Sequence, residues 1–144
     1  MSFFDTLEKN VNIKLNKQQK EAVSHLDGPA LVLAGPGSGK TTVIICRLAH
    51  MIFEWGIEPS EILSMTFNKA AAIEMRNRFA RVFGKFVNQS VRFSTLHSFA
   101  YSVLRDYERS RNMELTLIEG NEGALNKRNI LKKIYFDVNN AVIN

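Results

Sequence analysis

Residues 34–42 read Ala34-Gly35-Pro36-Gly37-Ser38-Gly39-Lys40-Thr41-Thr42, and this stretch constrains the fold more than any other part of the chain. A glycine-rich turn followed at once by Lys and Thr lets successive backbone N–H groups converge on a phosphate. The lysine ammonium then reaches the outer phosphates, and the threonine hydroxyl ligates Mg²⁺. The stretch predicts a binding site for a nucleoside triphosphate, in which Lys40 and Thr41 are the catalytic residues and Thr41 also holds the metal. The predicted nucleotide contacts are Gly35, Pro36, Gly37, Ser38, Gly39, Lys40, Thr41 and Thr42.

The strict form of this pattern has Gly at the position of Ala34, so the flanking sequence has to support it. Residues 29–34 are a short apolar run of the kind that makes a buried parallel strand. Apolar residues recur after the turn at helical spacing, and Gly56 gives that helix a stop. The order of strand, turn and helix points a helix N-terminus, with its partial positive charge, toward a bound anion. The alternative is an ordinary flexible turn, which would give Lys40 and Thr41 no structural role.

The remaining sequence repeats this alternation. Strands are predicted at residues 29–34, 61–67 and 91–95, and helices at residues 17–26, 40–54, 69–83, 96–107 and 122–139. Strands that alternate with helices form a parallel sheet with right-handed crossovers. We therefore expect an α/β fold, with a parallel sheet flanked by helices.

Ligands of open α/β sheets bind in the loops that follow the carboxyl ends of the strands. Three predicted loops meet that description: Gly35 to Lys40, Phe67 to Lys69, and Thr95 to Ser98. In a parallel sheet we expect all three to lie along one edge.

Composition limits the class of protein. At 144 residues, with 45% hydrophobic and 23% charged side chains, the chain suits one globular domain. No apolar run is long enough to cross a bilayer, and the first residues lack the features of a secretory signal. The single cysteine, Cys46, cannot form an internal disulfide and falls in an apolar helix, where we expect it to be buried. A cytoplasmic protein without membrane contact is expected.

The net charge of +5 is concentrated in one segment. Residues 69–111 hold 9 basic and 3 acidic side chains, whereas residues 1–68 hold 6 and 7, and residues 112–144 hold 4 and 4. A basic segment is typical of proteins that bind nucleic acid, although solvated helix faces also collect Lys and Arg. Charge alone leaves both interpretations open.

Four stretches taken together resemble the N-terminal part of superfamily 1A DNA helicases of the UvrD/Rep type. Residues 15–23 are similar to the Q motif, residues 34–41 to Walker A, residues 66–75 to motif Ia, and residues 94–99 to motif Ib. The resemblance implies a P-loop NTPase fold. It also implies a partial first RecA-like motor domain over residues 1–111, and the start of an inserted helical subdomain over residues 112–144.

The resemblance further implies ATP and Mg²⁺ as cofactors and single-stranded DNA as partner. Gln19 is then expected to read the adenine edge, and Lys40 to contact the β and γ phosphates. Contacts to single-stranded DNA are implied for Phe67, Asn68, Lys69, Thr95, His97 and Ser98. In family members an Arg often follows the Walker threonine and helps to enclose the base, whereas this chain has Thr42.

Each implied contact has a plainer alternative. Gln19 stands three residues after Asn16 at a helix start, so it could complete a capping box. Phe67 ends an apolar strand and could belong to the core, while His97 could be a local cap or a packing residue. His25 and His50 have no partners at ligand spacing, so we interpret both as structural and expect no metal site made by protein side chains alone.

Hydrolysis requires groups that the sequence does not supply. A strand ending in Asp-Glu is missing, and Asp137 falls in a helical pattern where it should be exposed. The arginines of the second motor domain have no counterparts. We therefore expect an N-terminal piece of a helicase that does not hydrolyse ATP by itself and that self-associates through uncovered apolar faces. The alternatives are a small nucleotide kinase, for which no acceptor cluster is visible, and a non-catalytic nucleotide- and DNA-binding module from a truncated helicase gene.

Overall fold

The computed structural model describes residues 2–87, 89–115 and 127–141. It divides into two compact units, Met1–Ala100 and Tyr101–Asn144. The division falls inside one long helix, α5 (Leu96–Arg111). The domain boundary expected between residues 111 and 112 stays a prediction.

Three helices precede the sheet, namely α1 (Phe3–Val11), α2 (Lys17–Ser24) and α3 (Lys40–Phe53). Two of them, α2 and α3, begin where the sequence predicts. The first helix was not anticipated, although its start carries a capping box: the Ser2 hydroxyl accepts a hydrogen bond from the Asp5 amide at 3.3 Å, and the Asp5 carboxylate accepts from the Ser2 amide at 3.1 Å.

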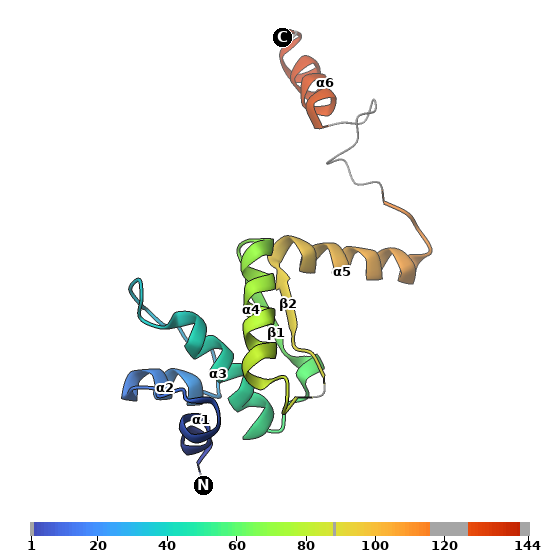
Figure 1. Cartoon of the computed structure of the whole chain (residues 1–144). Helices are drawn as coiled ribbons and strands as arrows, with labels where there is room; N and C mark the ends of the chain where they lie inside the picture. Colours follow the sequence, from blue (N-terminus) through green and yellow to red (C-terminus); the bar gives the residue numbers. More distant parts are fainter. Residues whose placement is uncertain (1, 88, 116–126, 142–144) are drawn as a thin grey trace. The chain divides into compact units, whose positions relative to one another are not determined.

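Two short parallel strands form the sheet (Figure 1). A turn of 3₁₀ helix (Pro59–Glu61) leads into β1 (Leu63–Thr66); α4 (Lys69–Phe83) then returns the chain to β2 (Arg92–Thr95). Leu63 pairs with Arg92 at one end of the ladder, and Thr66 pairs with Thr95 at the other. The parallel α/β arrangement predicted for this part of the chain is confirmed.

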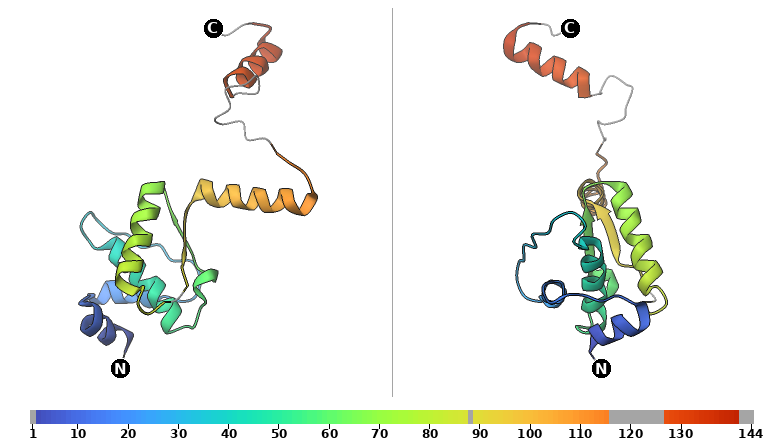
Figure 2. Two further views of the ribbon diagram at one scale, coloured as in Figure 1. Left: turned by 45° about the vertical axis from the view of Figure 1, so that its right-hand side comes forward. Right: turned by 60° about the vertical axis from the view of Figure 1, so that its left-hand side comes forward.

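The strand predicted at residues 29–34 is wrong. These residues have no regular secondary structure, and Leu31, Val32 and Leu33 are 86%, 58% and 86% exposed. A strand forms only where a neighbour accepts and donates its backbone hydrogen bonds, and the described strands pair with each other in a two-stranded sheet. In both views of Figure 2 this segment belongs to an open loop between α2 and α3.

The hydrophobic core of the first unit lies where α1 to α4 meet the starts of the strands. Its most buried members are Val23 on α2 and Ile45, Cys46 and Ala49 on α3, all at most 1% exposed. Around them pack Phe3, Leu7, Leu15, Leu48, Ile62, Phe79, Phe83 and Val91. The prediction that Cys46 is buried is confirmed, and burial raises the pKa of its thiol to about 11, so it is not a reactive group at neutral pH.

His50 is a packing residue, as the sequence predicts. Its ring lies among Phe3, Phe4 and Trp55, with ring-centroid distances of 4.9, 5.7 and 4.9 Å. Burial holds the pKa of His50 below its usual value, because the charged imidazolium would lose its hydration; Glu54 partly opposes this effect and Arg47 adds to it. The aromatic contacts dock α1 against the C-terminal end of α3.

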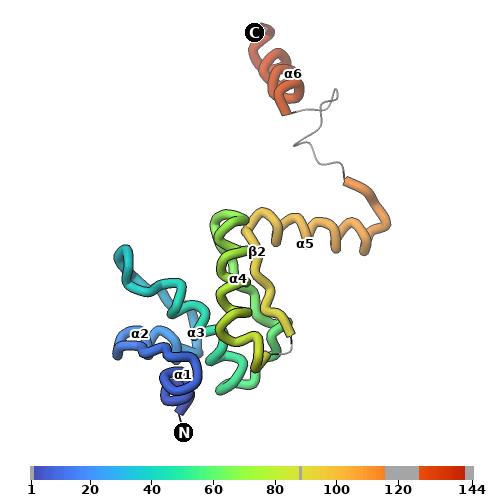
Figure 3. Tube along the Cα trace, in the orientation of Figure 1, coloured from blue at the N-terminus to red at the C-terminus, as the bar shows by residue number. Residues whose placement is uncertain are grey.

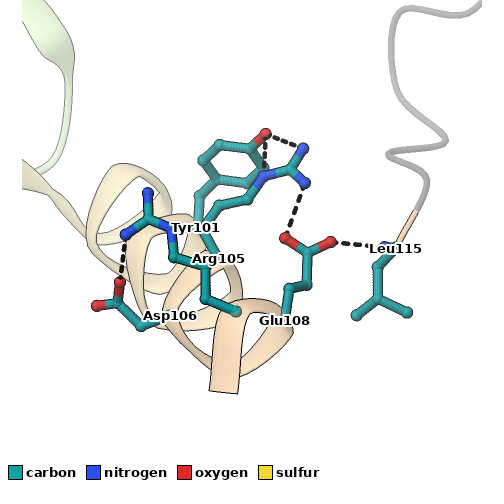
Figure 4. Close-up of polar contacts among 6 residues, drawn as sticks. Tyr101, Arg105, Asp106, Glu108 and Leu115 are labelled. Carbon is teal, nitrogen blue, oxygen red and sulfur yellow. Dashed lines mark hydrogen bonds and ion pairs between the residues drawn. The ribbon is translucent and has the colours of Figure 1, made fainter. Parts of the chain in front are cut away.

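In the second unit, the C-terminal part of α5 is tied to the segment that follows it (Figure 4). Arg105 donates to the Tyr101 hydroxyl at 2.7 Å and to the Glu108 carboxylate at 2.7 Å. The other oxygen of Glu108 accepts the Leu115 amide at 2.6 Å. The hydrogen bond from the Leu115 amide is the main reason that the pKa of Glu108 is lowered. The Glu108 carboxylate thus fixes where the chain leaves the helix.

The last described helix, α6, spans Lys127–Asn139. It covers most of the helix predicted over residues 122–139, and residues 122–126 of that prediction lie outside the described part of the chain. Asp137 lies on this helix and is exposed, as predicted. Within the described residues, no helix is both long enough and apolar enough to cross a membrane.

Candidate functional site

The glycine-rich loop depends on glycine at its last position. Gly37 and Gly39 have φ values of +73° and +81°, in the left-handed region that favours glycine. Gly39 directly precedes α3, and a Cβ at this position would stand 3.2 Å from the Gln19 amide nitrogen. Position 39 therefore disfavours other residues, both because its φ is left-handed and because a Cβ there would crowd the Gln19 side chain.

The lysine of the loop folds back over it. The Lys40 ammonium donates to the Gly35 carbonyl at 2.7 Å and to the Ala34 carbonyl at 3.3 Å. The Ser38 hydroxyl closes the same turn by donating to the Gly35 carbonyl at 2.8 Å. The positive charge is thus held beside the loop.

Gln19 completes a capping box, and it also contacts the loop. Its carbonyl oxygen accepts the Asn16 amide at 2.9 Å, while the Asn16 side chain accepts the Gln19 amide at 2.9 Å. Its side-chain nitrogen donates to the Ser38 carbonyl at 3.0 Å. The alternative drawn from the sequence is therefore confirmed, and the structure adds a tie from α2 to the loop that the spacing did not reveal.

A cavity of about 610 Å³ lies between α2, the exposed residues 30–34 and α3. This volume is within the range of small-ligand sites, about 300–1,000 Å³. Gln19 and Lys40 are both among the residues that line it. The described residues that line it include Lys40 and Arg47 but no Asp or Glu, so its charge favours an anion; the lining residues are Asn16, Gln18, Gln19, Ala22, Ala30, Val32, Leu33, Ala34, Gly35, Ser38, Lys40, Val43, Ile44 and Arg47.

Arg47 joins two walls of this cavity, a role that sequence reasoning missed. From α3 its guanidinium donates to the last carbonyls of α2, at 3.0 Å to Ala22 and 3.4 Å to Val23, and also to His25. Its charge also stands 5.8 Å from the ring of Trp55. An arginine among the apolar residues of a predicted helix was the available signal, because such a side chain needs a partner when it is partly buried.

The two threonines after Lys40 differ in their surroundings. Both are half-buried in the first turn of α3. The Thr42 hydroxyl accepts a hydrogen bond from Arg78 of α4 at 2.9 Å, so it is turned toward that helix. The structure thus gives Thr42 a protein partner, and its predicted nucleotide contact stays a prediction.

The end of β1 presents a bare aromatic ring. Phe67 is 97% exposed, so the alternative that it belongs to the core is wrong. The next residue, Asn68, caps α4 by accepting the Ala71 amide at 2.8 Å, and its own carbonyl accepts the Thr66 hydroxyl at 2.9 Å. These bonds fix the turn that carries Phe67 and places the exposed Lys69 at the start of α4.

The end of β2 forms a similar turn. Thr95 is buried, and its hydroxyl oxygen accepts the Ser98 amide at 3.1 Å and lies 2.9 Å from the Ser98 hydroxyl. Thr95 therefore caps the start of α5. His97 is exposed, so the alternative of a packing histidine is wrong.

The ladder brings these two turns together. Since Thr66 pairs with Thr95 in a parallel register, the residues that follow them emerge at the same end of the sheet. That part of the expected edge is confirmed. The glycine-rich loop is not joined to this edge by a strand, because residues 29–34 pair with neither β1 nor β2.

A family model and curated relatives agree when the chain is compared with known proteins. The family model described as UvrD/REP helicase N-terminal domain matches residues 15–142. The ATP-dependent DNA helicase UvrD1 of Mycobacterium leprae is 46% identical over 92 residues, which cover 64% of this chain and 12% of that protein. The ATP-dependent DNA helicase PcrA of Leuconostoc citreum is 35% identical over 127 residues, 87% of this chain and 16% of that protein.

The ATP-dependent DNA helicase Rep of Escherichia coli is 38% identical over 93 residues, 65% of this chain and 14% of that protein. The chain thus aligns with 12% to 16% of the length of these three curated relatives. All three printed names describe DNA helicases that depend on ATP.

Proposed function

The chain belongs to the UvrD/REP helicase N-terminal domain family, and on that premise we propose that it is the ATP-binding N-terminal part of a DNA helicase. The whole protein would translocate on single-stranded DNA and unwind duplex by hydrolysing ATP. The observation that carries the proposal is the cavity in which a glycine turn, the Lys40 ammonium and the Gln19 amide converge. A P-loop NTPase fold with a partial RecA-like domain, and a cytoplasmic location, belong to the same proposal.

The residues around the cavity fit a magnesium nucleotide. Gly39 leaves room that a Cβ would fill, and Lys40 supplies a charge for the outer phosphates. The Thr41 hydroxyl, in the first turn of α3, is of the type that holds Mg²⁺ beside a phosphate. When bound, the metal neutralises charge on the phosphate oxygens.

Gln19 keeps enough hydrogen-bonding capacity to meet an adenine edge. A side-chain amide has two N–H donors and a carbonyl oxygen with two lone pairs. The contacts to Ser38 and Asn16 use one donor and one lone pair. The remaining donor and lone pair suit the paired acceptor and donor of adenine, so the capping role and the nucleotide role are compatible.

The two turns at the end of the sheet suit single-stranded DNA. The exposed ring of Phe67 offers a surface on which an unstacked base can lie, and Lys69 offers a charge for phosphate. The exposed His97 and Ser98 lie at the start of α5, where helix amides favour an anion. Asn68 and Thr95 would act chiefly by fixing these turns.

We further propose that these 144 residues do not hydrolyse ATP by themselves. Hydrolysis needs a carboxylate that orients the metal, and the described lining of the cavity has none. The same observation favours the alternative of a non-catalytic module that binds nucleotide and DNA. Phosphate release with saturating oligothymidine tests the point, and turnover above ~1 per second would contradict it.

Titration of a fluorescent ATP analogue in the presence of Mg²⁺ tests the nucleotide site. The wild-type chain should bind it, and Lys40→Ala should weaken binding by about 10- to 100-fold, the value of a charged hydrogen bond. Lys9→Ala, which removes the same charge from an exposed position on α1, should leave the affinity unchanged. Failure of the wild type to bind overturns the proposal.

Titration of labelled oligothymidine at several salt concentrations tests the DNA site. Loss of one phosphate contact in Lys69→Ala should reduce the slope of log affinity against log salt by about 1. Phe67→Ala should lower affinity with little change in slope, because stacking releases no counterions. An unchanged slope in Lys69→Ala would remove that residue from the site.

A further inference from the structure

Arg78 joins two helices that belong to different proposed sites. It lies in the third turn of α4, half-buried, and its guanidinium donates to the Thr42 hydroxyl at 2.9 Å. Thr42 is in the first turn of α3, directly after the proposed metal ligand Thr41. The two partners are 36 residues apart in sequence, so no motif or spacing pointed to the pair.

The contact is part of a packed interface between helices. Cys46, one helical turn after Thr42, is fully buried, and Arg78 is close enough for its charge to oppose the rise in the pKa of that thiol. Phe79, next to Arg78, belongs to the core. Figure 3 shows α3 in teal and α4 in green as neighbouring coils. Displacement of one helix in such an interface disturbs the other, because packed side chains leave little free space.

Each helix begins at one of the proposed sites. The helix α4 starts at Lys69, directly after Phe67 and its capping residue Asn68. From Lys69 to Arg78 the helix rises about 13 Å, a span over which an α-helix is a stiff rod. The helix α3 starts at Lys40, directly after the glycine-rich loop.

We propose that Arg78 is a positioning residue that couples the two sites: single-stranded DNA at the start of α4 changes nucleotide affinity through the Arg78–Thr42 hydrogen bond. The inference rests on the proposed function, because it takes both ligands from it. The coupling is reciprocal, so nucleotide changes DNA affinity by the same factor. Arg78 contacts neither ligand in this scheme; it sets the position of the first turn of α3.

The experiment measures the affinity for a fluorescent ATP analogue with and without saturating oligothymidine. We expect DNA to change the wild-type affinity by about 5-fold or more, the lower end of ordinary coupling between sites. In Arg78→Ala and in Thr42→Val this ratio should fall to near 1. Thr42→Ser, which keeps the hydroxyl, should retain it, and so should Arg81→Ala, which removes an exposed charge from the same helix.

The outcomes separate the two proposals. A wild type that binds no nucleotide overturns the proposed function and the coupling together. A wild type that binds both ligands with a ratio near 1 overturns the coupling alone. The coupling is also overturned if Arg78→Ala changes the nucleotide affinity with and without DNA by the same factor, so that the ratio of the two affinities stays as in the wild type. A purely structural role of Arg78 predicts that result. If Arg78→Ala does not fold, Thr42→Val decides, because it leaves the arginine in place.

Discussion

Two apolar runs of similar appearance end differently in this molecule. Residues 61–67 contain β1, whose backbone pairs with β2 and whose entry is anchored by Ile62, 4% exposed. Residues 29–34 form no strand, and Leu33 is 86% exposed. Both runs lead into a loop that the sequence predicts to hold a ligand. The comparison shows that an apolar run becomes a strand only where another backbone is available to it.

The glycine-rich loop is nevertheless formed, although the segment before it is not a strand. Its geometry comes mainly from contacts within the loop, namely the left-handed glycines and the Lys40 bonds to the Ala34 and Gly35 carbonyls, and Gln19 of α2 adds one bond to the Ser38 carbonyl. The loop is therefore mostly a local structure, whereas a strand over residues 29–34 would need a backbone partner from elsewhere in the chain. Four measurements test this distinction.

Hydrogen exchange should show the largest difference. The amides that form the ladder between β1 and β2 should exchange about 100-fold or more slowly than those of residues 30–34, because ladder amides exchange only when the structure opens. Mass spectrometry of peptides covering the two runs measures both in one sample. Equal protection would mean that residues 29–34 acquire a backbone partner in solution, including one from a second copy of the chain.

Truncating one apolar residue in each run to alanine should give losses in the free energy of unfolding that differ by about 2 kcal/mol or more. Ile62→Ala leaves a cavity in the core and should lower the free energy of unfolding by about 2–5 kcal/mol. Leu33→Ala removes an exposed side chain and should change it by less than about 0.5 kcal/mol. Urea unfolding followed by circular dichroism compares the two. A large loss in Leu33→Ala would show that this segment is packed after all.

Substitution of glycines should separate the strained part of the loop from the rest. Gly39→Ala forces a left-handed alanine against Gln19 and should destabilise the chain by about 1–2 kcal/mol. Gly35→Ala meets open space and has no left-handed φ, so the stability of the chain without ligand should hardly change. Thermal unfolding of both variants is the measurement. Equal losses would place the strain elsewhere.

The pH dependence of stability should show the smallest effect. It tests the packing of His50 against α1 at the C-terminal end of α3. The folded state lowers the pKa of His50, mainly by burial, whereas in the unfolded chain this pKa has its usual value of about 6.5. Below that pH the unfolded chain therefore binds more protons than the folded chain. Stability should therefore be complete above that pH and decline below it. His50→Leu should flatten the decline between pH 7.5 and 5.5. An unchanged slope of melting temperature against pH would assign the decline to other groups.

Much of the local structure could be predicted from the sequence. The start of α2 directly after its cap Asn16, the bounds of α4 and the burial of Cys46 follow from caps, helical spacing and an apolar face. The start of α1 carries a signal of the same kind, because Ser2 and Asp5 stand at the spacing of a capping box. These features depend on residues within one or two turns of each other.

The parts of the site that were missed involve residues far apart in the chain. Arg47 reaches the carbonyls of α2 from α3, and Arg78 reaches Thr42 from α4. Gln19 shows the limit most clearly, since its spacing from Asn16 predicts the capping box but not its bond to the Ser38 carbonyl. The exposure of Phe67 likewise depends on what packs over the end of β1.

Residues close together in the chain account for the glycine turn and for the starts of α2, α3 and α4, because φ preferences, caps and charge act over a few residues. Contacts between elements account for which apolar run pairs as a strand, which neighbour Thr42 meets, and where Arg47 and Arg78 find their acceptors. These outcomes require backbone and side-chain groups from separate elements to meet, and a hydrogen bond or a ladder exists only when both partners are in place.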